Sequence, residues 1–296
     1  MSSEFVMALK SRDKRAIRET PKGNMHSHAG KGCSVEYLER RLGIEIPPAQ
    51  TPFHSLKQMH HWYTKHIGKY CSSLAGMLMR WEGCFVEAAK DGIEVMVQSF
   101  STKAIEDVGG IGVFASILES YRTQYCPDIL FLPELTFSRD FDVEHGLIQL
   151  KNILPSGYFK SVDICFDETA CPVDRFVPIY RECAKHGLVL KAHVGEFGTP
   201  EDVAVAVETL DLKEVHHGIA LCTSKELMEW AKQRQLVLNI CPSSNVQMGL
   251  VRSMRAHPIR TLYEAGVPVT ICTDDLLIFQ SSLSTEYERL YLCFGG

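Results

Sequence analysis

Eight short apolar runs recur along the chain, and a longer segment with helical periodicity separates each run from the next. The runs are Asn24–His28, Glu94–Phe100, Ile129–Leu135, Phe159–Phe166, Leu188–Val194, Val215–Leu221, Leu236–Cys241 and Val267–Thr273. Several are almost continuously apolar, which is typical of parallel strands covered on both faces. The predicted helices between them include Leu74–Lys90, Asp174–His186, Pro200–Leu210, Ser224–Gln233 and His257–Ala265. This alternation predicts a parallel sheet with helices around it.

Eight strands favour closure into a (β/α)8 TIM barrel over an open, doubly wound sheet. The open fold would need a glycine-rich phosphate turn after the first strand, and His28–Cys33 lacks the G-x-G-x-x-G pattern. A length of 296 residues allows two domains, but barrels of about 250 residues are a standing exception. We therefore expect one α/β domain over residues 1–296, with extra helices over the carboxyl-end face in the long connection Cys33–Tyr70.

The composition narrows the class of protein further. Hydrophobic residues make up 45% and charged residues 23%, which excludes a disordered or fibrous chain. A net charge of -5 argues against nucleic-acid binding, and no apolar run approaches the roughly 18 residues of a membrane span. The charged segment Met1–Lys22 has no apolar leader, and the eleven cysteines show no C-x-x-C pair. We expect a cytoplasmic protein whose cysteines are reduced and packed in the core. The sequence predicts no particular oligomeric state.

Polar residues stand where several of the predicted strands end. His26 and His28 are two residues apart and so point to the same side, and His193 lies in the fifth run. His216 and His217 belong to the sixth, and Asp274 and Asp275 follow the eighth. Catalytic groups of a (β/α)8 barrel gather at the carboxyl ends of its strands. These side chains are therefore expected to meet near the barrel axis.

Burying so many titratable groups together is costly unless a cation compensates them. The imidazoles of His26, His28 and His193 with the carboxylate of Asp274 suit one Zn²⁺ per chain, or another divalent transition metal. Such a set leaves one coordination position open for water. The sequence thus predicts a catalytic metal site.

Several motifs, taken in order, resemble those of one protein family. They are Pro21–His28, His193-Val194-Gly195-Glu196, His217-Gly218, Cys241–Val246, His257-Pro258, Ala265-Gly266-Val267 and Thr273-Asp274-Asp275. Together they resemble the adenosine deaminase family of the metal-dependent amidohydrolase superfamily. The resemblance covers nearly the whole chain and is strongest from Lys191 onward.

The resemblance implies a zinc-dependent hydrolytic deaminase of adenosine or a related aminopurine or amino-heterocycle, an aminohydrolase of purine metabolism. The metal would lower the pKa of its bound water to about 7 and so provide hydroxide. His217 would orient or deprotonate this water, and Asp274 would help to hold it. Glu196 would protonate a ring nitrogen of the substrate, and Asp275 would hydrogen-bond the other side of the base, before ammonia leaves.

The positions implied in substrate binding are His28, Gly195, Phe166 and Asp275. Here the chain departs from the family pattern. Ala29-Gly30-Lys31 replaces the usual L-[DN]-G, so the sugar-binding side chain is missing. Phe166 stands where a glycine usually meets the purine edge, Val97-Gln98-Ser99 replaces E-x-R, and Leu276 replaces a proline. Phe166 is expected to block or reshape the base edge, and Lys31 to meet an anionic group such as phosphate or carboxylate. Deamination is therefore predicted more firmly than adenosine itself.

Two other functions remain open. One is a hydrolase of the same superfamily that cleaves an amide or ester. Binuclear hydrolases of this kind bridge two metals with a modified lysine or a carboxylate on strand four. In this chain Lys160 lies at the start of the fourth run and not at its end. The other is an altered deaminase-like protein with a non-adenosine ligand, catalytic or not. The histidines of His54–His66 are expected on a lid helix with an aromatic face, and Gly109–Gly112 at a loop-to-helix turn. One helix start, Thr285–Glu288, follows Asp275, so we expect a compact variant or a shortened C-terminus.

Overall fold

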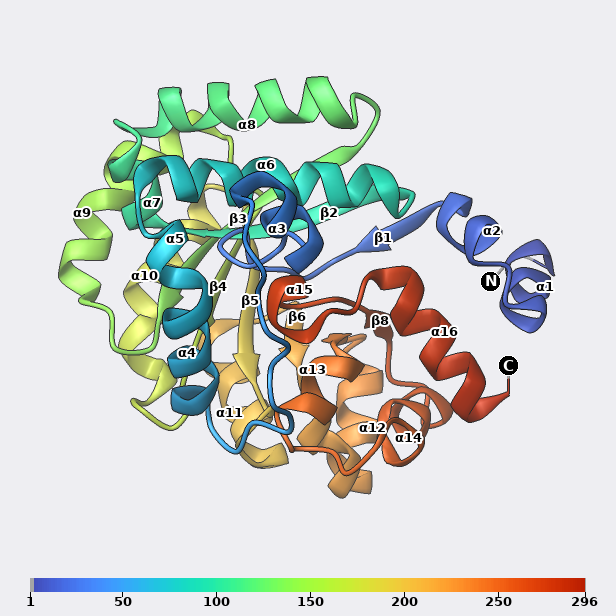
Figure 1. Ribbon diagram of the computed structural model, residues 1–296. Helices are drawn as coiled ribbons and strands as arrows, with labels where there is room; N and C mark the ends of the chain where they lie inside the picture. Colours follow the sequence, from blue (N-terminus) through green and yellow to red (C-terminus); the bar gives the residue numbers. More distant parts are fainter. Residues whose placement is uncertain (1–2, 296) are drawn as a thin grey trace.

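A computed structural model, which describes residues 3–295, shows one parallel sheet with the strand order β1 to β8 (Figure 1). The strands are β1 Lys22–Asn24, β2 Ile93–Ser101, β3 Leu130–Ser138, β4 Ser161–Cys165, β5 Val189–Val194, β6 Glu214–His217, β7 Val237–Ile240 and β8 Val269–Ile271. A parallel bridge between Ser27 and Asp274 joins the segments that follow β1 and β8. The sheet thus forms a nearly closed barrel, which confirms the predicted fold class.

Three strands end at least two residues earlier than the sequence predicts. β1 ends at Asn24, so His26 and His28 lie on the segment after it, and β6 and β8 end at His217 and Ile271. His217 and Asp274 adopt φ angles of 65° and 59°. A residue with a positive φ cannot continue an extended strand, so the chain turns at these side chains. This backbone conformation is invisible in the pattern of apolar residues.

Helices surround the barrel (Figure 1). The α-helices are α1 Ser3–Ser11, α2 Lys14–Glu19, α3 Val35–Leu42, α4 Leu56–Tyr63, α5 Lys69–Cys71, α6 Leu74–Lys90, α7 Thr102–Asp107, α8 Ile111–Tyr125, α9 Val143–Ile153, α10 Val177–Lys185, α11 Pro200–Leu210, α12 Lys225–Gln233, α13 Pro242–Gln247, α14 Ile259–Glu264, α15 Leu276–Phe279 and α16 Leu283–Phe294. Shorter turns are η1 Thr64–Gly68, η2 Leu154–Ser156, η3 Val173–Phe176, η4 Ile219–Thr223 and η5 Met254–Ala256. The predicted helices Leu74–Lys90 and Pro200–Leu210 are found with these bounds. Among residues 3–295, no helix has both the length and the apolar character to cross a bilayer.

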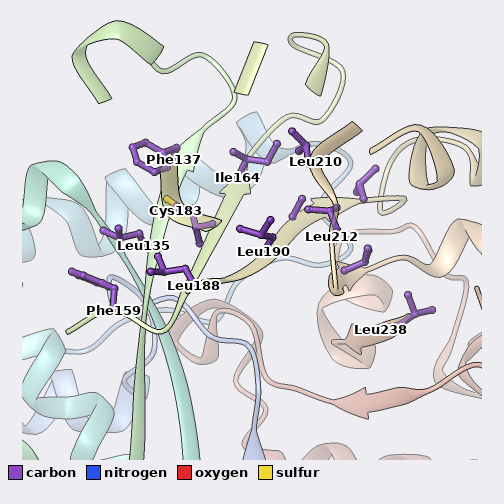
Figure 2. Close-up of a cluster of buried hydrophobic side chains, with 14 of the residues drawn as sticks. Leu135, Phe137, Phe159, Ile164, Cys183, Leu188, Leu190, Leu210, Leu212 and Leu238 are labelled. Atoms are coloured by element: carbon purple, nitrogen blue, oxygen red, sulfur yellow. The ribbon is translucent and has the colours of Figure 1, made fainter. Parts of the chain in front are cut away.

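The main core lies between the outer face of the sheet and the surrounding helices. Figure 2 shows Ile164 and Leu190 from neighbouring strands beside Cys183 of α10. All three side chains are at least 94% buried. The cysteines are free thiols, and seven of the eleven are buried. The seven buried cysteines act as small apolar residues of the core, as the sequence predicts, whereas Cys126, Cys171, Cys222 and Cys293 are only partly buried.

The long connection between β1 and α6 forms α3, α4, η1 and α5, which confirms the predicted extra helices. α4 begins at its N-cap Ser55, whose hydroxyl accepts from Gln58 N. Its Met59 and Trp62 are buried in a second apolar cluster that includes Phe279 of α15. Because this cluster joins two segments beyond the strand ends, it fixes α4 over the barrel mouth.

α16 contacts α13, the helix that carries Ser244 and Asn245, two residues of the candidate active site described below. Glu286 of α16 is fully buried, and its carboxylate accepts from Ser243 N at 3.1 Å. Burial raises the pKa of Glu286 to about 7, although hydrogen bonds and Arg289 oppose this shift. The carboxyl group therefore keeps its proton in the folded protein at pH values where the unfolded chain has lost it.

Glu286→Gln is expected to stabilise the fold at pH 8 by roughly 1–3 kcal/mol and to have a much smaller effect at pH 4. In the wild-type protein, the contribution of Glu286 to stability is complete below about pH 4.3 and falls as the pH rises towards about 7. Glutamine has no proton to lose. Denaturant unfolding at both pH values measures this difference, with Glu288→Gln on the same helix as the control. Equal destabilisation at both pH values would contradict it.

Candidate active site

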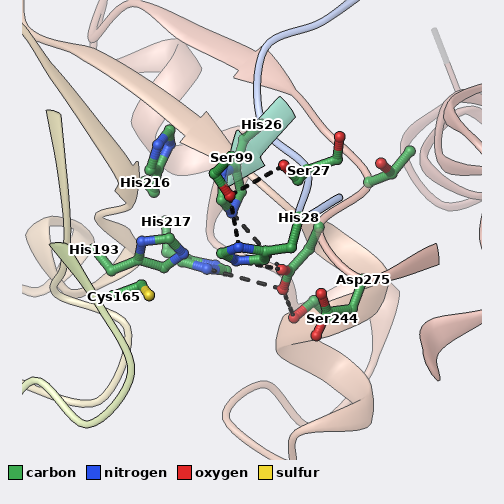
Figure 3. Close-up of polar contacts among 12 residues, drawn as sticks. His26, Ser27, His28, Ser99, Cys165, His193, His216, His217, Ser244 and Asp275 are labelled. Carbon is green, nitrogen blue, oxygen red and sulfur yellow. Dashed lines mark hydrogen bonds and ion pairs between the residues drawn. The ribbon is translucent and has the colours of Figure 1, made fainter. Parts of the chain in front are cut away.

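Histidines and a carboxylate from opposite parts of the chain converge inside the barrel mouth (Figure 3). The ring centroids of His26 and His193 are 4.7 Å apart, and those of His28 and His193 are 5.2 Å apart. Asp274 Oδ1 lies 3.7 Å from His26 Nε2 and 3.5 Å from His28 Nε2. The structure therefore brings together all four side chains that the sequence predicts as metal ligands.

These donors suit a divalent cation. Burial lowers the pKa values of His26 and His28 well below the ordinary value, so both imidazoles are neutral and have a lone pair to donate. His26 is fully buried, and neither of its ring nitrogens has a hydrogen-bond partner among residues 3–295. Nitrogen and oxygen atoms of His26, His28 and Asp274 lie within 4.8 Å of one another. A buried imidazole without a partner, beside two further donors, fits a metal better than an empty polar core.

A second set of residues orients these donors. Ser99 Oγ lies 2.8 Å from His28 Nδ1, and Asp163 Oδ1 lies 2.9 Å from His193 Nδ1. Ser244 Oγ donates to Asp274 Oδ2 at 2.6 Å. Such contacts set the tautomer and direction of metal-binding side chains. The sequence pointed to Ser244 only as one of the serines before Asn245, within the motif Cys241–Val246, that could line the rim of the pocket. It did not select Ser99 or Asp163 as partners of metal ligands, and their only signal was their place in the apolar runs of the second and fourth strands.

Glu196 and His217 face each other beside this cluster. His217 Nε2 lies 3.7 Å from Glu196 Oε2 and 4.0 Å from Asp274 Oδ2. Burial raises the pKa of Glu196 well above its usual range, which favours the protonated form of its carboxyl group. Burial also lowers the pKa of His217 to about 4, which keeps the imidazole neutral. The amide of Asn245 fixes this ring through Nδ1 at 3.1 Å. The site thus places a proton donor beside a neutral imidazole.

Glu168, which sequence reasoning did not select, holds the loop that carries Glu196. Its carboxylate accepts from Gly195 N at 2.6 Å, from Gly198 N at 2.5 Å and from Phe197 N. Gly195 has a φ of 71°, and a Cβ there would lie 2.4 Å from Val203 Cγ2, so the turn requires glycine. Gly195, predicted to bind substrate, directs its N–H to Glu168. The only signal in the sequence was the cluster Asp167-Glu168 just after the fourth run.

Glu168→Ala is expected to lower kcat by roughly 10- to 100-fold while bound metal stays unchanged, because the loop loses the acceptor that positions Glu196. Glu168→Gln, which keeps the length and one acceptor oxygen, should lose less. Steady-state kinetics with metal analysis tests this, and Asp167→Ala, at an exposed neighbour, is the control. A kcat unchanged in Glu168→Ala would contradict the positioning role.

The cavity at these groups is lined by polar side chains, such as Glu196, and by apolar ones, such as Met59 and Phe279. Phe166 lies just after β4, half exposed, with its ring 5.2 Å from that of His60. Its φ of 73° is one that favours glycine, the residue usual at this position in the family that the chain resembles. The sequence predicts that Lys31 meets an anionic group of the ligand. In the structure its Nζ is instead paired within the protein, 2.8 Å from Asp275 Oδ2. The two side chains approach because the segments after β1 and β8 adjoin.

The fold and this site define a (β/α)8-barrel enzyme with a histidine–carboxylate centre at the carboxyl ends of its strands. The sequence model described as adenosine deaminase matches residues 148–295. Over 277 residues the chain is 27% identical to a putative adenosine/adenine deaminase of Treponema pallidum. This match covers 93% of each of the two chains. The chain belongs to the adenosine deaminase family. It is a hydrolytic deaminase that acts on C–N bonds.

Solved structures show the same fold. The adenine deaminase of Arthrobacter aurescens superposes with a TM-score of 0.78 at 20% identity, over 94% of this chain and 88% of that one. An amidohydrolase from Burkholderia ambifaria with bound zinc superposes with a TM-score of 0.78 at 18% identity, over 100% of this chain and 84% of that one. At these identities the likeness concerns the architecture alone.

Proposed function

We propose that this protein is a zinc-dependent hydrolytic deaminase of adenosine or a related aminopurine or amino-heterocycle. One observation carries the proposal: three of the four potential metal ligands, His28, His193 and Asp274, line a single cavity. The fourth, His26, is buried beside them, with its ring centroid 4.7 Å from that of His193. Glu196, whose pKa is raised by burial, lines the same cavity. The name of the Treponema relative and the zinc in the Burkholderia structure support the same reading. The substrate is a small molecule that enters through the rim beneath α4.

His26, His28, His193 and Asp274 would hold the metal, which would supply a hydroxide nucleophile at neutral pH. Glu196 has a proton to give, and we assign it to the ring nitrogen beside the amino-bearing carbon. Protonation there makes this carbon electrophilic. His217, neutral and fixed by Asn245, orients the attacking water through Nε2 at the side of Glu196 and Asp274. Water and the N=C–NH2 group become HN–C=O and ammonia. The ring nitrogen keeps the proton from Glu196; of the two protons of water, one leaves with the amino group as ammonia and the other restores Glu196.

An ammonia-release screen tests this function. Purified protein with its metal content measured would be offered adenosine, adenine, methylated adenines, nucleotides, other aminated heterocycles, and simple amides and esters. Release of ammonia from at least one aminated heterocycle, with about one transition metal per chain, is the expected result. Cleavage of amides or esters alone would favour the other hydrolase class instead.

A further inference from the structure

The three imidazoles predicted to bind the metal are not held in the same way. His28 is hydrogen-bonded to Ser99 at Nδ1. His193 is hydrogen-bonded to Asp163 at Nδ1. His26 has no hydrogen-bond partner at either ring nitrogen in the part of the chain that the structure describes. Since metal-binding histidines are ordinarily oriented by a hydrogen bond at the second nitrogen, another contact must orient His26.

The imidazole of His216 lies flat against that of His26 (Figure 3). The ring centroids are 3.8 Å apart and the ring planes are inclined by 24°, so the two faces are in van der Waals contact. Both side chains are fully buried. His28, His193 and His217 meet the same ring edge-on, at angles between 73° and 83°. Because His26 cannot turn about its Cβ–Cγ bond without striking the stacked ring, His216 restricts its direction.

The ring of His216 is itself fixed at both nitrogens. Glu134 Oε1 lies 3.2 Å from Nε2, and Asn239 Nδ2 lies 3.3 Å from Nδ1. The carboxylate of Glu134 is held in turn, because its Oε2 accepts from Ser161 Oγ at 2.7 Å. These three partners lie on β3, β7 and β4, and His216 lies on β6. Four strands of the barrel therefore determine the position of one ring.

A buried ion pair completes this network. Lys191 Nζ lies 3.4 Å from Glu134 Oε2 and 3.0 Å from Glu214 Oε2. Branched apolar residues commonly fill the interior of a (β/α)8 barrel, and a buried ion pair seldom stabilises a fold more than such packing does. Stability alone therefore does not explain these charged residues. They are not among the residues that line the active-site cavity, and the network reaches the predicted metal ligands through His216.

A second metal ion is the alternative to consider, since His26, Glu134 and His216 offer ligand atoms within 4.8 Å of one another. The geometry does not favour it. The lone pair of an imidazole nitrogen lies in the ring plane, so two nearly parallel rings direct their lone pairs side by side and not to one point between them. Both carboxylate oxygens of Glu134 already have protein partners. A single metal, with His216 behind one of its ligands, agrees with all of these contacts.

We infer that His216 is a positioning residue of the metal centre: by stacking on His26, it holds this ligand in the orientation in which it binds the metal. The stacked ring does for His26 what the hydrogen bonds of Ser99 and Asp163 do for the other two imidazoles. This inference rests on the metal-dependent function proposed above, and it gives a role to a side chain that does not line the substrate cavity.

The affinity of the metal-free protein for Zn²⁺ tests the inference, measured by competition with a chromogenic chelator where circular dichroism shows an intact fold. His216→Ala removes the stacked ring and is expected to raise the Kd for Zn²⁺ by roughly 10- to 100-fold, the range for loss of a group that orients a ligand. His216→Phe keeps a flat ring and should bind Zn²⁺ at least about 3-fold more tightly than His216→Ala. His145→Ala, at an exposed position of α9, is the control and should bind as the wild type does. An unchanged Kd in His216→Ala overturns the inference, and so does an equal Kd in the alanine and phenylalanine variants.

A double-mutant cycle shows whether His216 acts through His26, and it remains decisive if His216→Phe does not fold. Adding His216→Ala to His26→Ala should change the Kd for Zn²⁺ by no more than about 2-fold, because the ring that His216 positions is already absent. Ser99→Ala frees a different ligand, His28, and should still weaken binding in the same background. An equal loss from His216→Ala with and without His26 overturns the inference.

The proposed function and this inference fail in different ways. If Zn²⁺ binds at one per chain and less tightly in His216→Ala, but the wild type releases no ammonia, deamination fails and the inference stands. If the wild type releases ammonia and its Kd for Zn²⁺ equals that of His216→Ala, the inference fails and deamination stands. Two Zn²⁺ per chain, reduced to one in His216→Ala, would make His216 a ligand and overturn its positioning role. A protein that binds no Zn²⁺ overturns both.

Discussion

Glu196→Gln is expected to lower turnover by roughly 10²- to 10⁴-fold while leaving the bound metal unchanged, which is the range for loss of a positioned general acid. Glu196 is at least nine-tenths buried and carries a raised pKa, so its role depends on a proton that glutamine cannot transfer. The change nearly preserves shape and keeps a hydrogen-bonding group beside His217. The loss should therefore appear in kcat far more than in folding.

The measurement is ammonia release from the best substrate of the screen, together with metal analysis and thermal unfolding. Glu201→Gln, at an exposed position of α11, is the matched control and should behave as the wild type. Full activity in Glu196→Gln would show that another group supplies the proton. Loss of both metal and activity would instead place Glu196 in the ligand set.

Removal of the metal by a chelator is expected to abolish turnover and to lower the thermal unfolding temperature. Without a cation, both ring nitrogens of His26 remain buried with no hydrogen-bond partner among residues 3–295, and only the Ser244 hydroxyl group hydrogen-bonds the buried carboxylate of Asp274. A ligand that binds only the folded state stabilises it by mass action, so its loss destabilises the fold. Addition of Zn²⁺ should restore both activity and unfolding temperature.

The Asp274→Ala variant tests the same metal dependence by mutation. It removes a predicted metal ligand and also the acceptor of the Ser244 hydroxyl group. We expect it to lower the metal content of the purified protein well below one per chain. A protein that is purified without metal and works equally well with chelator present would refute the metal-dependent mechanism and leave the fold unaffected.

The architecture and much of the site were predictable from local signals. Eight apolar runs of strand length are enough to favour a barrel, since parallel strands with helices between them have few other ways to bury both faces. His26 and His28 lie just after β1, and Asp274 and Asp275 lie just after β8. The topology of the barrel makes the two segments neighbours, as the bridge between Ser27 and Asp274 shows. For the same reason the sequence could predict which side chains gather there; their role as metal ligands stays a prediction.

What the sequence by itself determined was therefore the barrel and the set of groups at its mouth. Only the tertiary structure decided how those groups are paired. Lys31 and Asp275 are 244 residues apart, and Glu168 reaches the N–H of Gly195 across 27 residues. Such contacts depend on the path of the loops and on a few left-handed residues, which periodicity does not encode. The sequence predicted that Lys31 meets an anionic group of the ligand, whereas in the structure its ammonium group pairs with the carboxylate of Asp275.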